Sequence, residues 1–285
     1  MADRDSEPRS PMKDFGWLAL FLVVLGVIWF AQGGATRLSS ITSPFLNPPE
    51  IAPSGSSSSS GGTTAQGPSS SYKGKINLSV WNAKETDPQN EYIEIRAYSD
   101  IKPISVSDWT IEDQRGSKFS LGRGANLFFL SQVNNQDPVI LAPNGVIIVT
   151  TGRSPVGASF RLNLCTGYFN QFQNFTPSLS QECPRIDEKD IPQSFPSACV
   201  DFIRSLSSCR MPVNTIPAAV GNDCTLFINE KINYNGCVAA YKNENNFYRN
   251  EWRVYLNRDK EIWATRGTII LRDQDGKVVD EESYY

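Results

Sequence analysis

The chain has 285 residues, with 27 Lys and Arg against 30 Asp and Glu, six Cys and no His. The absence of imidazole excludes Ser-His-Asp and Cys-His nucleophile pairs, a His general base and any zinc site that uses His. A net charge of −3 argues against a nucleic-acid partner, because nucleic-acid affinity is built from clustered Lys and Arg.

A long apolar segment lies near the N-terminus. Residues 15–31 read FGWLALFLVVLGVIWFA, and no charge occurs between Asp14 and Arg37. As a helix this uncharged stretch rises about 33 Å, which is enough to cross a hydrocarbon core about 30 Å thick. We therefore expect a tail over 1–14 and a transmembrane helix over 15–36. A cleaved signal peptide is the alternative, although the stretch is longer than a usual signal core.

Lys and Arg on the two sides of this segment set its expected orientation. Arg4, Arg9 and Lys13 precede it, whereas only Arg37 follows it before Lys73. The bias predicts a single-pass protein of the cell membrane with a cytoplasmic N-terminus. The lipid bilayer is then a partner through residues 15–36, and the rest of the chain is extracytoplasmic.

The segment after the predicted span is rich in Ser, Gly and Pro, with five consecutive serines over 56–60. Such a composition has too few apolar side chains to offset the entropy of ordering the chain. We expect a disordered linker over 37–74.

After residue 75 the apolar residues alternate with polar ones, which is typical of half-buried strands. Strands are predicted at 76–82, 91–98, 107–112, 145–151, 252–256 and 267–272, with a further strand from 277. In the second of these, Ile93, Ile95 and Ala97 fall on one face. Two Asp-Gln-x-Gly turns, beginning at Asp113 and Asp273, predict two hairpins of one domain.

Between these β segments the apolar spacing becomes helical. The clearest helix is predicted over 197–210, with Ser197 as its N-cap, and shorter helices are predicted at 167–175, 224–232 and 236–243. We therefore predict one β-sandwich, formed by 75–153 and 251–285, which is interrupted by a helical insertion over 154–250.

Four stretches of the β segments resemble the lamin-tail domain family. They are Asn90–Ile95 (NEYIEI), the strand around Trp109 with its turn, Leu141–Val149 (LAPNGVIIV) and Ile269–Asp280 (IILRDQDGKVVD). The resemblance implies an immunoglobulin-like β-sandwich, and since the chain has no heptad-patterned rod it is similar to the bacterial, membrane-anchored members. The insertion departs from the family pattern, so the resemblance does not carry a binding function.

All six cysteines lie in the predicted insertion, at Cys165, Cys183, Cys199, Cys209, Cys224 and Cys237. No two are spaced as a Cys-x-x-Cys pair, so a metal site lacks its usual ligand spacing. An even number outside the cytoplasm predicts three disulfides of open pairing, with buried free thiols as the alternative. Cys199 and Cys209 are about 15 Å apart on one helix, too far to bond each other.

The insertion also carries two groups of aromatic residues near amides. We take as a candidate ligand surface the side chains of Tyr168, Phe169, Phe172, Tyr241, Phe247 and Tyr248. Aromatic faces beside amides suit sugars, whereas the alternative is that these rings pack the insertion onto the sandwich.

Together these features predict a binding, adhesion or structural module of the cell envelope, with no enzymatic activity, cofactor or metal. Its expected partner is an extracytoplasmic protein or glycan. The alternative is an envelope glycan hydrolase that uses only carboxylates, because two facing acids suffice for that chemistry. The candidate acids are Glu182, Asp187, Glu188, Asp190 and Asp201.

Overall fold

The structure is a computed structural model that describes residues 21–25, 27, 67–213, 216–263 and 265–285. The chain divides into two units, residues 1–61 and residues 62–285. In the first unit, residues 21–25 and 27 are helical. The predicted tail at 1–14, the rest of the predicted span at 15–36 and the predicted linker up to residue 66 lie outside the described residues. Among the described helices, none combines the length and apolar character needed to cross a membrane.

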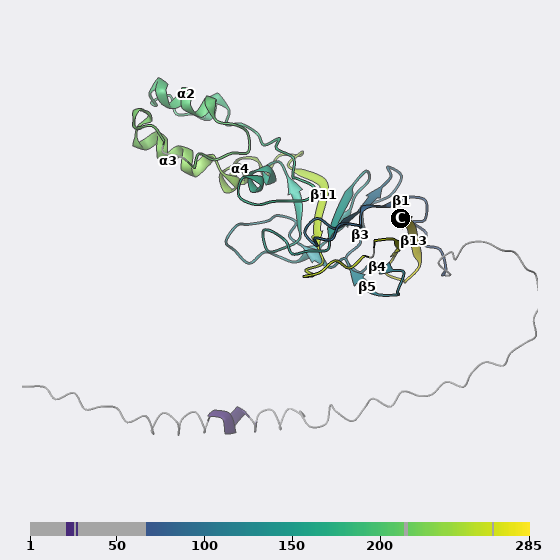
Figure 1. The fold of residues 1–285 in the computed structure, drawn as a ribbon. Helices are drawn as coiled ribbons and strands as arrows, with labels where there is room; N and C mark the ends of the chain where they lie inside the picture. The colour runs from purple at the N-terminus through teal and green to yellow at the C-terminus, as the bar shows by residue number, and fades with distance from the viewer. Residues whose placement is uncertain (1–20, 26, 28–66, 214–215, 264) are drawn as a thin grey trace, which may run out of the picture. The chain divides into compact units, whose positions relative to one another are not determined.

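The second unit contains two main β-sheets (Figure 1), and the prediction of a mainly β protein is confirmed. The five-stranded sheet has the order β1 (Ile76–Asn82), β2 (Tyr92–Ala97), β9 (Val146–Thr150), β11 (Tyr248–Tyr255) and β10 (Phe160–Asn163). The four-stranded sheet has the order β13 (Val278–Tyr284), β12 (Gly267–Arg272), β4 (Thr110–Asp113) and β5 (Lys118–Ser120). Two short ribbons pair β3 (Ile104–Ser105) with β8 (Ile140–Leu141) and β6 (Arg123–Gly124) with β7 (Asp137–Pro138).

The two sheets bury a common core because each strand turns its apolar positions inward. Ile93, Ile95 and Ala97 of β2 are buried on one face, as the alternation predicts. Trp109 and Trp252 are the largest fully buried side chains, and they belong to the same apolar cluster. Their indole N–H groups donate hydrogen bonds, from Trp109 to Gln274 Oε1 at 2.9 Å and from Trp252 to the Ile140 carbonyl at 3.0 Å. The polar atoms of these rings are therefore paired inside the core.

The two Asp-Gln-x-Gly turns close the hairpins β4–β5 and β12–β13 of one sheet, which confirms the prediction. In each turn the Oδ1 atom of the first residue accepts hydrogen bonds from the backbone N–H groups two and four residues later. The distances are 2.8 Å for both bonds to Asp113, and 3.0 and 2.9 Å for those to Asp273. The Asp-Gln-x-Gly sequence therefore occurs twice because the same hydrogen bonds from the backbone to the Asp side chain stabilise both turns.

The chain enters the second unit along β13. The N–H of Ser70 donates to the Val278 carbonyl at 2.8 Å, and the N–H of Val278 donates to the Pro68 carbonyl at 3.0 Å. The predicted linker over 37–74 was therefore wrong at its end, because Pro68 to Ser70 pair with the four-stranded sheet. At the same edge, the N–H of Leu78 on β1 donates to Asp280 Oδ2 at 2.7 Å, which joins the two sheets.

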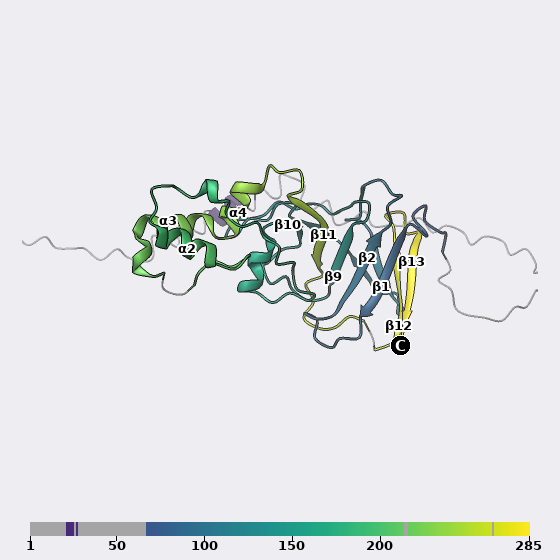
Figure 2. The same ribbon diagram turned by 90° about the horizontal axis from the view of Figure 1, so that it is seen from above.

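The helical elements lie between β10 and β11, as predicted in outline. They are the 3₁₀ turns η1 (Thr166–Gln171), η2 (Glu188–Asp190) and η3 (Ala218–Val220), and the helices α2 (Ser197–Ser205), α3 (Asn222–Lys231) and α4 (Tyr234–Tyr241). Figures 1 and 2 show α2 and α3 at the end of this unit that is far from β1 and β13.

The insertion is shorter than the predicted 154–250. Both β10 and the first residues of β11 fall inside that range, yet they pair with each other and extend the five-stranded sheet. The short apolar alternation of β10 was missed. We use "two-sheet domain" for residues 67–163 and 248–285, and "insertion" for residues 164–247.

The helix predicted over 197–210 ends at Ser205, and Pro196 rather than Ser197 is its N-cap. The chain leaves the helix at Leu206, which has an extended backbone. Cys209 has a φ of 56° and is bonded to Cys183. A continued helix would carry Cys209 away from that partner, so the disulfide explains why the helical spacing does not extend the helix.

Candidate functional site

Three disulfides hold the insertion, which confirms the predicted bonding of all six cysteines. Cys165 is joined to Cys237, Cys183 to Cys209, and Cys199 to Cys224. The first bond ties the end of β10 to α4, and the third ties α2 to α3. Cys199 and Cys209 have different partners, as their predicted separation required.

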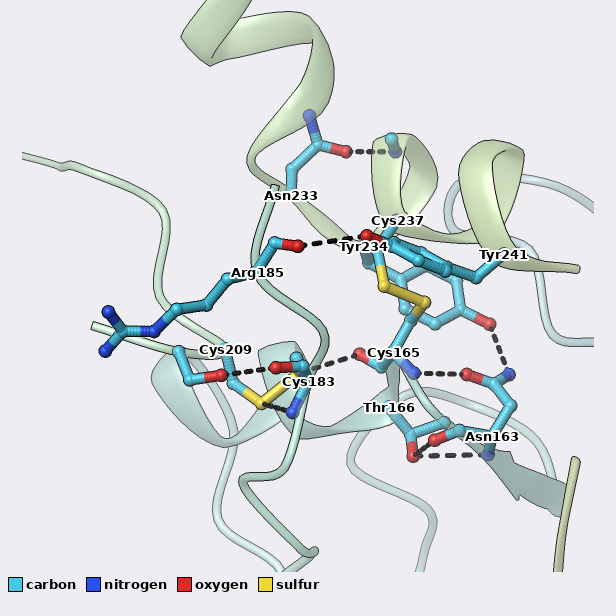
Figure 3. Close-up of a disulfide and its surroundings, with 12 residues drawn as sticks. Asn163, Cys165, Thr166, Cys183, Arg185, Cys209, Asn233, Tyr234, Cys237 and Tyr241 are labelled. Carbon is cyan, nitrogen blue, oxygen red and sulfur yellow. Dashed lines mark hydrogen bonds between the residues drawn. A yellow bond between two sulfur atoms is a disulfide. The ribbon is translucent and has the colours of Figure 1, made fainter. Parts of the chain in front are cut away.

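A network of polar groups surrounds the bond between Cys165 and Cys237 (Figure 3). The Nδ2 of Asn163 donates to the Tyr234 hydroxyl at 3.3 Å, and its Oδ1 accepts from the Cys165 N–H at 2.8 Å. The Tyr234 hydroxyl in turn donates to the Phe128 carbonyl at 2.7 Å. Burial raises the pKa of Tyr234 well above its usual value, so the phenol keeps its proton. α4 is therefore fixed both to β10 and to the loop that contains Phe128.

A pocket of about 910 Å³ lies where this loop meets the insertion. Its walls come from the loop between β6 and β7, the loop between β9 and β10, η1, and the turn before α4. The lining residues include Phe128, Phe129, Gln132, Gln136, Phe169, Phe172, Gln173, Tyr234 and Asn235. Among the described residues that line this pocket there is no Asp, Glu, Lys or Arg. We call it the neutral pocket.

The β6–β7 loop is held in shape by Asn134. Its Oδ1 accepts from the Phe129 N–H at 2.6 Å, and its Nδ2 donates to the carbonyls of Phe129 at 3.0 Å and Gln132 at 3.2 Å. These bonds close the loop on itself and leave the Phe129 side chain 40 % exposed. The loop therefore presents an aromatic ring to solvent from a backbone fixed by its own hydrogen bonds.

The six amide side chains of the neutral pocket divide into two kinds. Asn134 and Asn233 use their amide groups within the fold, Asn233 by capping α4 and bonding to the end of α3. Among the hydrogen bonds of the described residues, none involves the side-chain amide of the other four, which are Gln132, Gln136, Gln173 and Asn235. Each of these four retains donors and an acceptor for a bound molecule.

The structure separates the aromatic residues of the candidate ligand surface. Tyr168, Phe169 and Phe172 line the neutral pocket, where Phe172 is 59 % exposed and the other two are buried in its floor. Tyr241 lines a different pocket of about 420 Å³, together with Tyr168, and its hydroxyl donates to the Arg185 carbonyl at 3.0 Å (Figure 3).

Phe247 belongs to a buried cluster, and Tyr248 packs against that cluster. Phe247 is fully buried, and its ring meets that of Tyr248 edge-on at 5.0 Å. The Arg161 guanidinium lies over the Tyr248 ring at 4.8 Å. For Phe247 the packing alternative holds, and its inclusion in a ligand surface was wrong, because its side chain is fully buried. Tyr248 is half-buried, so its inclusion in a ligand surface stays a prediction.

The β6–β7 loop was not predicted as part of a ligand surface. A signal for it exists in Leu127 to Leu130, an apolar run that has neither the alternation of a strand nor the spacing of a helix. Three amides, Gln132, Asn134 and Gln136, follow it closely. When an apolar run fits neither a strand nor a helix and amide residues follow it, the sequence indicates a loop with exposed aromatic side chains.

The five candidate acids are all exposed, and none lines the neutral pocket. Four pair with basic side chains: Glu182 with Arg249 at 3.4 Å, Asp187 with Lys189 at 2.9 Å, Glu188 with Arg204 at 2.9 Å and Asp201 with Arg204 at 3.9 Å. The hydrogen bond from Lys189 and its charge lower the pKa of Asp187, which opposes the protonated state that a general acid needs. Within the described residues, no group of three acidic or Cys side chains is placed to hold a metal ion.

Comparisons of the chain with known protein families, with curated proteins and with solved structures gave no match.

Proposed function

We propose that the protein is a membrane-anchored, extracytoplasmic binding module of the cell envelope, and that it binds its partner through the neutral pocket. The observation that carries this proposal is the composition of the pocket: a concave site of about 910 Å³ with exposed aromatic rings, unused amides and no charged side chain. Pockets that are mostly apolar, with a few polar groups, are typical of ligand sites. Catalysis by a carboxylate or by a Lys side chain would require a group that is not among the described residues of this lining.

The insertion and the first described residues of the second unit lie at opposite ends of the five-stranded sheet. Pro68 to Ser70 join the unit at β13, beside β1, whereas the insertion leaves from β10 and β11 at the other end of the five-stranded sheet. Four strand spacings separate β1 from β10, or about 19 Å. Three disulfides also suit an oxidising compartment outside the cytoplasm.

For the two-sheet domain we propose the immunoglobulin-like fold of the lamin-tail family. Support comes from two sheets around one core and from the two hairpins with Asp-Gln-x-Gly turns. In this proposal the domain is the support, and the insertion and the β6–β7 loop supply the binding surface. A fold of this kind does not itself specify a ligand.

The test uses full-length protein, purified in mild detergent, and isolated envelope fragments. Phe172→Ala removes an exposed ring of the pocket, and Trp81→Ala removes a ring that is 87 % exposed on β1, outside the pocket. We expect the wild type and Trp81→Ala to be retained equally on the fragments, and Phe172→Ala to be retained several-fold less. Equal retention of both variants, or release of soluble sugar fragments by the protein, would contradict the proposal; release would favour the hydrolase.

Topology is tested on intact cells with an added protease. Digestion of the C-terminal unit from outside, with the N-terminal tail protected, is expected. Protection of the C-terminal unit until the cells are permeabilised would contradict the proposed orientation.

A further inference from the structure

The side chains that line the neutral pocket indicate whether its ligand is charged. With no Asp, Glu, Lys or Arg in the lining, a charged group that entered would lose hydration without gaining a counter-charge. The only titratable lining groups are the phenols of Tyr168 and Tyr234, and burial raises the pKa of both. The site therefore favours an uncharged ligand.

The aromatic part of the pocket has a fixed floor and exposed walls. Phe128 and Phe169 are buried and meet edge-on at 5.6 Å, and Phe169 lies 4.4 Å from the Tyr234 ring, centre to centre. Above this floor, Phe129 and Phe172 keep 40 % and 59 % of their surface exposed. Packed rings beneath exposed rings form an apolar surface on which a flat C–H face can lie.

The unused amides surround this apolar surface with paired donors and acceptors. A sugar hydroxyl also both donates and accepts, so amides and hydroxyls match in either direction. A purely apolar ligand would desolvate Gln132, Gln136, Gln173 and Asn235 without pairing them, at a cost for each group. An extended peptide would seek a strand edge, but loops, a 3₁₀ turn and a helix start make up these walls.

We propose that the neutral pocket binds a short segment of an uncharged glycan, with sugar rings packed on Phe129 and Phe172 and hydroxyls bonded to the four unused amides. This inference rests on the proposed function and names the ligand of the same site. The volume of about 910 Å³ lies within the range of about 300–1,000 Å³ that holds small ligands, so a short oligosaccharide fits.

The test is an array of immobilised neutral hexose and N-acetylhexosamine oligosaccharides beside uronic-acid oligosaccharides of the same lengths, with uncharged peptides as a third set. Full-length protein in detergent is applied, and hits are measured by calorimetry. We expect binding to neutral oligosaccharides only. Phe172→Ala should weaken it about fivefold, which corresponds to the loss of one aromatic contact. Phe172→Trp should retain it, and Trp81→Ala should leave it unchanged.

Several results would overturn the inference: preference for uronic-acid oligosaccharides, preference for peptides, no oligosaccharide bound, or equal affinity of Phe172→Ala and the wild type. The envelope-retention experiment separates the two proposals. If Phe172→Ala still loses retention on the fragments while no oligosaccharide binds, the glycan inference fails and the binding module stands. Thermal melting of each variant shows that a loss of affinity is not a loss of folding.

Discussion

The two-sheet domain contains no cysteine, whereas the insertion contains all six. The domain is held by one large apolar cluster that both sheets share. The insertion has a cluster at its base, around Phe169 and Cys165, and a smaller one at its tip, around Ile228 and Cys199. Disulfides are therefore confined to the part of the chain whose buried apolar side chains fall into two separate clusters, as is common in small extracellular segments.

The strand order explains how the two-sheet domain supports the insertion. β9 and β11 are parallel neighbours, with Ile147 opposite Trp252, although the whole insertion lies between them in sequence. β10 and β11 act as the two stems of the insertion, and Cys165 follows β10 directly. We therefore expect a destabilising substitution in the core of the two-sheet domain to lower the stability of both regions. A substitution at the tip of the insertion should lower the stability of the insertion only.

The largest effect should follow Trp109→Ala. The ring is fully buried, lies 5.4 Å from Tyr72, and loses its hydrogen bond to Gln274. Large-to-small changes of this kind cost about 3–5 kcal/mol. Urea denaturation followed by circular dichroism should show strand and helix signals unfolding earlier and together. A helix signal that keeps its wild-type urea midpoint would contradict the expectation that both regions unfold together.

The next effect should follow replacement of Cys199 and Cys224 by Ser. The bond closes a loop with a sequence separation of 25 and joins α2 to α3. Its loss should cost about 3.5 kcal/mol in the chain-entropy account. Limited proteolysis should then cut within α2 and α3 while the strands stay protected. Early cleavage within β1 or β2 would contradict a local effect.

A smaller effect is expected for Glu91→Gln, at the join between β2 and the loop before β12. Glu91 is fully buried and accepts from the N–H groups of Ile262 and Trp263, both at 3.0 Å. A Gln at this position has one acceptor oxygen, so one N–H loses its partner at a cost of about 1–2 kcal/mol at neutral pH.

The same residue predicts a pH dependence. Burial raises the pKa of the Glu91 carboxyl, so the folded state binds its proton more tightly than the unfolded state. This contribution to stability is complete below the unfolded value of 4.5 and is lost as the pH rises through the folded value. Urea midpoints at several pH values should show this slope in the wild type and in the exposed control Glu85→Gln, but not in Glu91→Gln. An equal slope in all three would contradict it.

The smallest effect on folding should follow Phe172→Ala. Its side chain is 59 % exposed, so its removal should change the free energy of unfolding by less than about 0.5 kcal/mol. Thermal melting beside Trp81→Ala provides the measurement. A large loss of stability would show that Phe172 supports the insertion rather than a bound ligand.

Local sequence signals predicted the strands well. β1 and β12 have their predicted bounds, because alternation and flanking turns act within a few residues. The end of α2 was wrong because a disulfide to Cys183, far along the chain, determines the backbone at Cys209. Helical spacing alone carries no information about that bond. The disulfide partners stayed open for the same reason.

The candidate site was predicted in part. Tyr168, Phe169 and Phe172 lie together because the first two are in one 3₁₀ turn and Phe172 is its C-cap, which is a local feature. Phe129 and its neighbouring amides join them from a loop more than thirty residues earlier, through the bond between Tyr234 and Phe128. Such long-range contacts are set by the tertiary fold. The sequence pattern therefore predicted neither the part of the pocket formed by the β6–β7 loop nor the burial of Phe247.

Hydrogen exchange of the full-length protein, before and after reduction of its disulfides, tests most directly whether the two regions are stabilised in different ways. We predict that the amides of α2, α3 and α4 lose protection on reduction, while those of β1, β2 and β9 keep it. Loss of protection in both regions, or in neither, would contradict the account that packing holds the two-sheet domain and disulfides hold the insertion.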